Sequence, residues 1–244
     1  MEKKARIFRY IVANVVLIGA LLATIIYVVP LVGAAQPVDE PYFRGVSETE
    51  VAIMFKVDRN NSCGLDSIIE VLNKHNKVAT FFVSGSWVLE NSDSLEKLVE
   101  YGHQIGNGGF FESHTEKLSA AKIREEIELN HKLVYAVTRR QMDLFTPPSN
   151  YFLPTSLDIA RALGYTTIAG SNAPIKASDT SAQVLANIIA NINPGDFIML
   201  PTTSIVAGML DKLLQHIAQQ ELVSTTAGAL LRKITIELPA ESRR

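Results

Sequence analysis

The sequence predicts an α/β fold in which parallel strands form a (β/α) barrel. From residue 49 onward, short apolar runs rich in β-branched and aromatic residues alternate with helical patterns, which is typical of strands joined by crossover helices. At least six strand and helix units follow one another, and no glycine-rich phosphate loop follows the first strand. These observations favour a barrel over a dinucleotide-binding sheet, and they direct attention to the carboxyl ends of the strands.

The individual elements follow from local patterns. Strands are expected at residues 51–55, 78–83, 104–107, 143–145, 166–170 and 196–200. Helices are expected at residues 65–73, 93–101, 120–137, 156–163, 182–192 and 205–219. Asp93 and Glu96 have the spacing of a capping box, while Ser119 and Thr155 are expected to be N-caps of the next two helices. Gly164 is expected to end the helix that Thr155 begins.

A long uncharged segment precedes this domain. No charged residue lies between Tyr10 and Val38, and the apolar stretch is longer than the roughly 17 residues needed to cross a bilayer. The tail at 1–9 carries four basic residues, so the positive-inside rule predicts a cytoplasmic N-terminus and an extracytoplasmic domain. We therefore expect a single-pass protein of the cell membrane. A secreted protein is the alternative, because residues 33–35 resemble a signal-peptidase site.

These features divide the chain into parts. The expected boundaries are a cytoplasmic basic tail at 1–9, a transmembrane helix at 10–32, a linker at 33–48, the α/β domain at 49–235 and a C-terminal tail at 236–244. Four of the 23 basic residues and one of the 25 acidic residues precede residue 39, which leaves the rest with a net charge of −5. No cationic excess exists for nucleic acid. The single cysteine, Cys63, excludes an intrachain disulfide and a cysteine-built zinc site.

Five short motifs point to a known family. They read VATFFVSGSWV, EYGHQIGN, FTPPSN, ALGYTTI and NPGDFIML, in this order. Together they resemble the polysaccharide deacetylases with a NodB homology domain, over about residues 51–231. The resemblance implies a distorted (β/α) barrel of the NodB type. It also implies a divalent metal held by one aspartate and two histidines, with a second aspartate as the base for water attack on an N-acetyl group.

The sequence departs from this family pattern where the chemistry would take place. The base position falls on Lys56 and the metal-aspartate position on Val57. The two histidine positions fall on Gly108 and Glu112. Valine and glycine carry no ligand atom, and catalytic zinc usually has three protein ligands. We therefore expect no metal and no other cofactor at these positions.

Three further motifs lack their working side chains. The motif that carries an arginine in the family begins here at Thr146. The aspartate expected near Ser171 falls on Asn172 or Ala173, and the histidine that would act as general acid falls on Pro201. Proline has no titratable proton, so we expect no catalytic residue in the family positions.

A few polar residues remain near the same strand ends. Asp58, Glu112 and His114 could form a relocated site for zinc or a similar metal, but each is displaced by up to two positions, and loop groups facing solvent are favoured. Lys56 is expected to pair with Glu112 inside the former site, with binding of an acidic sugar or a peptide carboxylate as the alternative. His103 is expected to cap helix carbonyls.

Aromatic residues near the same segments have two interpretations. Trp87, Phe110, Phe111 and Tyr151 could stack on sugar rings, although aromatic residues of a barrel are more often part of the core.

Taken together, the residues and the resemblance predict a membrane-anchored, non-catalytic deacetylase-like protein. Its expected partners are the membrane, through the N-terminal helix, and a cell-wall polysaccharide or an envelope protein. The alternative is an active metal-dependent N-deacetylase of peptidoglycan-like polysaccharide that uses the relocated residues. A purely structural role in an envelope assembly is the third possibility, and it would require a large exposed apolar patch.

Overall fold

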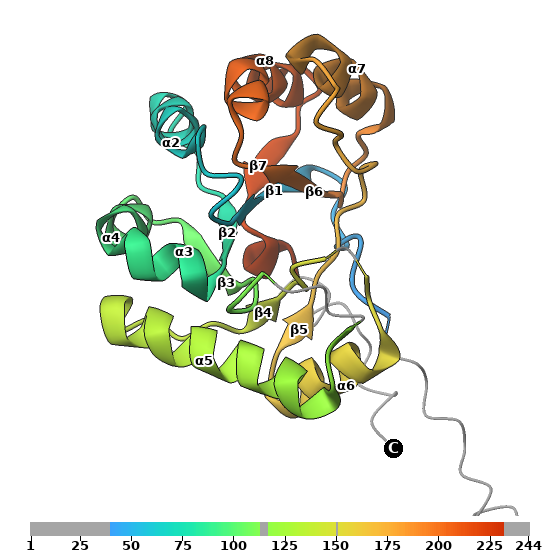
Figure 1. Ribbon diagram of the computed structural model, residues 1–244. Coiled ribbons are helices and arrows are strands. Elements are labelled where there is room, and N and C mark those ends of the chain that lie inside the picture. Colours follow the sequence, from blue (N-terminus) through green and yellow to red (C-terminus); the bar gives the residue numbers. More distant parts are fainter. Residues whose placement is uncertain (1–39, 113–116, 150, 232–244) are drawn as a thin grey trace, which may run out of the picture. The chain divides into compact units, whose positions relative to one another are not determined.

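The computed structural model describes residues 40–112, 117–149 and 151–231. In these ranges seven parallel strands form one sheet with the order β5-β4-β3-β2-β1-β6, and β7 pairs with β1. The helices lie around the outer side of the curved sheet (Figure 1). The predicted α/β class with a distorted barrel of parallel strands is confirmed.

Every strand and helix predicted for the α/β domain is present, with small shifts of its ends. The strands are β1 (Glu50–Val57), β2 (Thr80–Val83), β3 (Gln104–Asn107), β4 (Leu144–Phe145), β5 (Thr166–Thr167), β6 (Phe197–Pro201) and β7 (Val223–Thr225). The helices are α2 (Leu65–Lys74), α3 (Gly85–Glu90), α4 (Ser92–Glu100), α5 (Ala120–Thr138), α6 (Pro154–Ala162), α7 (Ser181–Asn191) and α8 (Ser204–Gln219). The largest shortening is at β5, where only two residues of the predicted strand at 166–170 pair as a strand.

The sequence patterns missed α3 and β7. Helix α3 has six residues, which is too short to show a helical period, and Ser84 caps it by accepting a hydrogen bond from the Trp87 N–H at 3.3 Å. Strand β7 has three residues and is defined by its pairing with β1. Both elements therefore depend on tertiary contacts.

Two of the three predicted helix caps are wrong. Helix α4 starts after Asn91 without a side-chain cap, so Asp93 lies inside its first turn. Helix α6 starts at Pro154, which places Thr155 one residue inside, because proline is well suited to the first helical position. The third cap is confirmed, since the Ser119 side chain accepts a hydrogen bond from the backbone of α5.

Strand β1 separates two apolar layers. Ile53 and Phe55 belong to the large cluster that packs the sheet against the helices. Ala52 and Met54 belong to a smaller cluster that also contains Phe82 of β2 and Phe197 of β6. Side chains alternate along a strand, so Lys56 continues the row of Ala52 and Met54 at the carboxyl end of β1.

Strands β5 and β6 do not pair directly in the described ranges, which leaves a seam between them. The chain before β1 helps to bridge this seam. The Tyr42 N–H donates to the Thr167 carbonyl at 2.9 Å, and the Gly45 N–H donates to the Gly195 carbonyl at 2.8 Å. Part of the segment predicted as a linker, 33–48, is therefore bonded to the barrel.

Within the described ranges, no helix combines the length and the apolar character needed to cross a bilayer. The predicted transmembrane segment at 10–32, the basic tail at 1–9 and the C-terminal tail at 236–244 lie outside these ranges.

Candidate functional site

The carboxyl ends of β1, β2 and β3 meet at one mouth of the barrel, where a cavity of about 140 Å³ opens. Strand pairing places Lys56 beside Phe82 of β2, and the loop after β3 completes the wall. The structure thus brings four predicted positions into one cavity: Lys56, Val57, Gly108 and Glu112.

Lys56 is directed at backbone carbonyls of the loop after β4. Its Nζ donates to the Pro147 carbonyl at 2.8 Å and to the Pro148 carbonyl at 3.3 Å. Burial lowers the pKa of Lys56 to about 8, and the nearby Asp58 carboxylate partly opposes this shift. The predicted ion pair between Lys56 and Glu112 is wrong, because Glu112 is bonded elsewhere.

Glu112 is held by donors from the chain itself. Its Oε1 accepts hydrogen bonds from the Ser84 hydroxyl at 2.7 Å, the Ser86 hydroxyl at 2.6 Å and the Arg59 N–H at 3.0 Å. Burial alone would raise the pKa of Glu112, but these hydrogen bonds, with the Arg59 charge, hold it below its usual value. The carboxylate is therefore ionised, and one of its two oxygens is already bonded by protein groups.

The other two family ligand positions have no side-chain atom that could bind a metal. Val57 is 1% exposed and belongs to the large apolar cluster that packs the sheet against the helices, here called the helix-side core cluster. A Cβ atom added at Gly108 would lie 3.0 Å from the Val83 carbonyl oxygen, which is a tight contact with backbone. A side chain introduced at position 108 would therefore require a shift of β2 or of the loop.

The remaining family positions have structural contacts. Thr146 is buried, and its N–H donates to the Asn107 carbonyl at 3.0 Å. Pro201 lies opposite Lys56 in the pairing of β1 with β6. Asn172 bonds the backbone of Met199 twice, accepting from its N–H at 2.7 Å and donating to its carbonyl at 3.0 Å.

The relocated set of Asp58, Glu112 and His114 is brought together only in part. Asp58 and Glu112 line the same cavity, while His114 lies outside the described ranges. The Asp58 carboxylate accepts hydrogen bonds of 2.9 Å from the Asn60 N–H and from the Asn61 amide. Among the described residues, no group of three or more His, Cys, Asp or Glu side chains is arranged to hold a metal ion.

A buried polar network supports the loop after β3, and no local sequence pattern predicted it. Glu126 of α5 accepts hydrogen bonds at its Oε2 from the Phe110 N–H at 2.9 Å and the Phe111 N–H at 2.7 Å. Asn107 accepts at its Oδ1 from the amide of Asn130 at 3.0 Å. The available signal was a carboxylate beside the apolar stripe of a predicted helix, which is weak because many such residues face solvent.

The remaining single-residue predictions have mixed outcomes. His103 is buried, and its Nδ1 accepts from the Ala79 N–H at 3.3 Å, so the prediction that it caps carbonyls is wrong. Burial lowers the pKa of His103 to about 4, which keeps the ring neutral. Trp87 is 1% exposed and belongs to the core, whereas Phe111 and Tyr151 are 52% and 62% exposed.

The sequence matches the family described as polysaccharide deacetylase over residues 45–168, which is just over half of the chain. The chain belongs to the polysaccharide deacetylase family. This agrees with the motif resemblance and with the barrel of parallel strands.

Curated relatives carry names from the same family. The chain is 30% identical over 142 residues to the peptidoglycan-N-acetylmuramic acid deacetylase PdaA of Bacillus subtilis, a match that covers 56% of this chain and 54% of PdaA. It is 26% identical over 194 residues to YlxY of B. subtilis, a protein of uncharacterized function, and this match covers 79% of this chain. The chain thus spans only 60% of the length of YlxY.

Solved structures show the same fold. BA3943 of Bacillus anthracis, described as a carbohydrate esterase family 4 pseudoenzyme, superposes with a TM-score of 0.73 at 25% identity, over 79% of this chain and 69% of BA3943. The structure of B. subtilis PdaA, a family 4 carbohydrate esterase, superposes with a TM-score of 0.71 at 24% identity, over 80% of this chain and 86% of PdaA.

Proposed function

We propose that this protein is a non-catalytic polysaccharide deacetylase homologue that binds N-acetylated cell-wall glycan at the outer face of the membrane. The observation that carries the proposal is the position of Lys56. Its ammonium group, at the family's base position, is bonded to the Pro147 and Pro148 carbonyls. An ammonium group held in this way has no role in activating a metal-bound water.

The residues present do not fit the divalent metal of the family. Of the base and ligand positions, only Glu112 supplies a carboxylate, and its Oε1 already accepts three hydrogen bonds. The cavity of about 140 Å³ is also small beside the roughly 300 Å³ of an ordinary small-molecule site. These features support a site from which the metal chemistry has been lost.

Two further considerations support cell-wall glycan as the ligand and the outer face of the membrane as the location. PdaA and other relatives are named for action on peptidoglycan, and BA3943 is described as a pseudoenzyme, so related barrels occur with and without catalysis. The uncharged segment at 10–32 supports a membrane anchor with the domain outside. Mass spectrometry of the mature protein tests the anchor, and a chain that begins near Gln36 would contradict it.

The catalytic part of the proposal is tested by calorimetry of the full-length protein in detergent with zinc and with cobalt. We expect no binding at micromolar metal. Micromolar binding that is lost in a Glu112→Ala, His114→Ala double variant would contradict the proposal and favour the relocated deacetylase, whose activity could then be assayed on peptidoglycan.

The binding part is tested by co-sedimentation of the full-length protein with purified peptidoglycan sacculi. We expect retention of the native protein and none of the heat-denatured protein. Equal recovery with and without sacculi would contradict glycan binding and favour a purely structural role in the envelope.

A further inference from the structure

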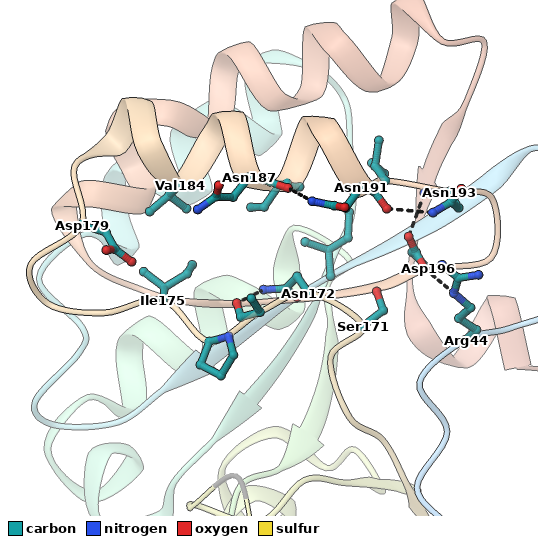
Figure 2. Close-up of a pocket in the computed structure, with 15 residues that line it drawn as sticks. Arg44, Ser171, Asn172, Ile175, Asp179, Val184, Asn187, Asn191, Asn193 and Asp196 are labelled. Carbon is teal, nitrogen blue, oxygen red and sulfur yellow. Dashed lines mark hydrogen bonds and ion pairs between the residues drawn. The ribbon is translucent and has the colours of Figure 1, made fainter.

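A second cavity lies away from the barrel mouth. It has a volume of about 610 Å³ and lies between α7 and the segment that follows β5, as Figure 2 shows. Ile198 of β6 forms part of its wall and belongs to the helix-side core cluster. The cavity is therefore on the outer side of the sheet, in the layer between strand and helix, and is separate from the cleft that contains Lys56.

The seam between β5 and β6 creates this space. The Ser171 N–H donates to the Phe197 carbonyl at 2.7 Å, and Asn172 bonds both backbone groups of Met199. These bonds tie the segment after β5 to β6 without a paired strand, and the side chains of α7 do not fill the gap above them. The wall is consequently held in place by hydrogen bonds before any ligand binds.

Apolar and amide side chains share the lining. Ile175 and Val184 face each other across one end of the cavity in Figure 2, and Ile188 lies on the same helix. Asn187 makes no side-chain hydrogen bond within the described part of the chain, so both its donor and its acceptor are available. Asn191 uses its amide N–H on the Asn187 carbonyl at 2.8 Å, which leaves its Oδ1 as a further acceptor. Such a mixture suits a ligand with both C–H faces and hydroxyl or amide groups.

The charges at the two ends disfavour acidic ligands. Asp179 lies at one end of the cavity and Asp196 at the other (Figure 2). Arg44 pairs with Asp196, with Nε 2.6 Å from Oδ1, so its charge is already compensated. The lining therefore carries one net negative charge, which disfavours carboxylate and phosphate groups and is compatible with a neutral ligand.

We infer that this cavity binds a neutral N-acetylated sugar residue of a glycan chain, with Asn187 and Asn191 bonding its hydroxyl or amide groups and the aliphatic wall contacting its methyl and C–H groups. The inference rests on the proposed function and assigns glycan binding to the cavity beneath α7. The cleft, with about 140 Å³, is less than a quarter as large.

The test uses the full-length protein in detergent and chitotetraose, a β-1,4-linked tetramer of N-acetylglucosamine, with affinity measured by calorimetry. An Asn187→Ala, Asn191→Ala double variant should bind at least about tenfold more weakly, because it removes the Asn187 amide and the Asn191 Oδ1 from one wall. Asn73→Ala is the matched control, since Asn73 is an exposed asparagine on α2 that lines none of the cavities described above, and its affinity should equal that of the wild type. Thermal unfolding confirms that each variant is folded.

The outcomes separate this inference from the proposed function. Equal affinity in the double variant, with binding lost in Lys56→Met, would place the sugar in the cleft and overturn the inference while leaving glycan binding intact. Absence of chitotetraose binding would overturn the inference as well, and the sacculus experiment would then decide by itself whether the protein binds glycan.

Discussion

The cleft at the barrel mouth and the cavity beneath α7 use their polar groups in opposite ways. In the cleft, Lys56 is bonded to two carbonyls, and Glu112 accepts hydrogen bonds from two hydroxyls and one backbone N–H. Beneath α7, Asn187 has no side-chain hydrogen bond in the described ranges, and the volume is about 610 Å³. Polar groups that satisfy one another stabilise the fold, whereas exposed and unsatisfied ones remain available to a ligand.

This contrast gives an order of sensitivity to mutation. Substitutions in the cleft should mainly change stability, because its polar groups bond the chain. Substitution of Asn187, which makes no side-chain hydrogen bond within the described residues, should mainly change ligand affinity.

Restoring a family aspartate should damage the fold. Val57→Asp buries a carboxylate among apolar side chains at a position that is 1% exposed, and we expect a loss of about 3–5 kcal/mol in the free energy of unfolding, measured by urea denaturation. Val223→Asp makes the same change at a strand position that is 47% exposed and should cost less than about 1 kcal/mol. A stable Val57→Asp protein that binds zinc would show that the metal site needs only this one ligand restored.

Removing the Glu112 carboxylate should cost about 2 kcal/mol at pH 7, because three donors lose their acceptor. Glu90→Ala is the matched control: Glu90 also bonds Arg59, but through an exposed ion pair, so a smaller loss is expected. Since the folded-state pKa of Glu112 is below its usual value, its contribution is present above about pH 4.5 and is lost as the pH falls through the folded-state pKa. Parallel acid-denaturation curves for wild type and Glu112→Ala would contradict this account.

Lys56 should produce a pH dependence of the same sign as that of Glu112, but in the alkaline range. Its pKa is about 8 in the folded protein and 10.5 without burial, so between these values the unfolded chain binds more protons and stability rises with pH. Relative to Lys56→Met, the wild type should gain about 1 kcal/mol between pH 8 and pH 9 in urea denaturation. Identical pH profiles for the two proteins would show that the Lys56 ammonium is solvated rather than buried.

Two asparagines of the cavity beneath α7 should differ from each other. Asn172→Ala removes two hydrogen bonds to Met199 and should cost about 1–2 kcal/mol in thermal unfolding. Asn187→Ala removes an exposed side chain without a hydrogen bond in the described chain and should change stability by less than about 0.5 kcal/mol. A comparable loss from both would indicate that Asn187 has a structural role.

Local patterns predicted most of the fold because each predicted element has its own periodicity or cap. The strand at 104–107 was predicted at its observed bounds, and Ser119 was predicted as the cap of α5. Helix α3 and strand β7 were missed because six and three residues are too few to show a period. The helix starts predicted from Asp93 and Thr155 were wrong because several neighbouring residues could begin each helix.

The sequence by itself determined the α/β class and the identity of the side chains at the family positions, because strand and helix periods and motif residues are local properties of the chain. Only the tertiary structure decided which groups Lys56 and Glu112 bond, since Pro147 is 91 residues away from Lys56 and Ser84 is 28 residues away from Glu112. The cavity beneath α7 likewise depends on the seam between β5 and β6, which are the two ends of the strand order and do not pair in the described ranges. Hydrogen-bond partners and unfilled space are set by packing between distant segments, and no local pattern records them.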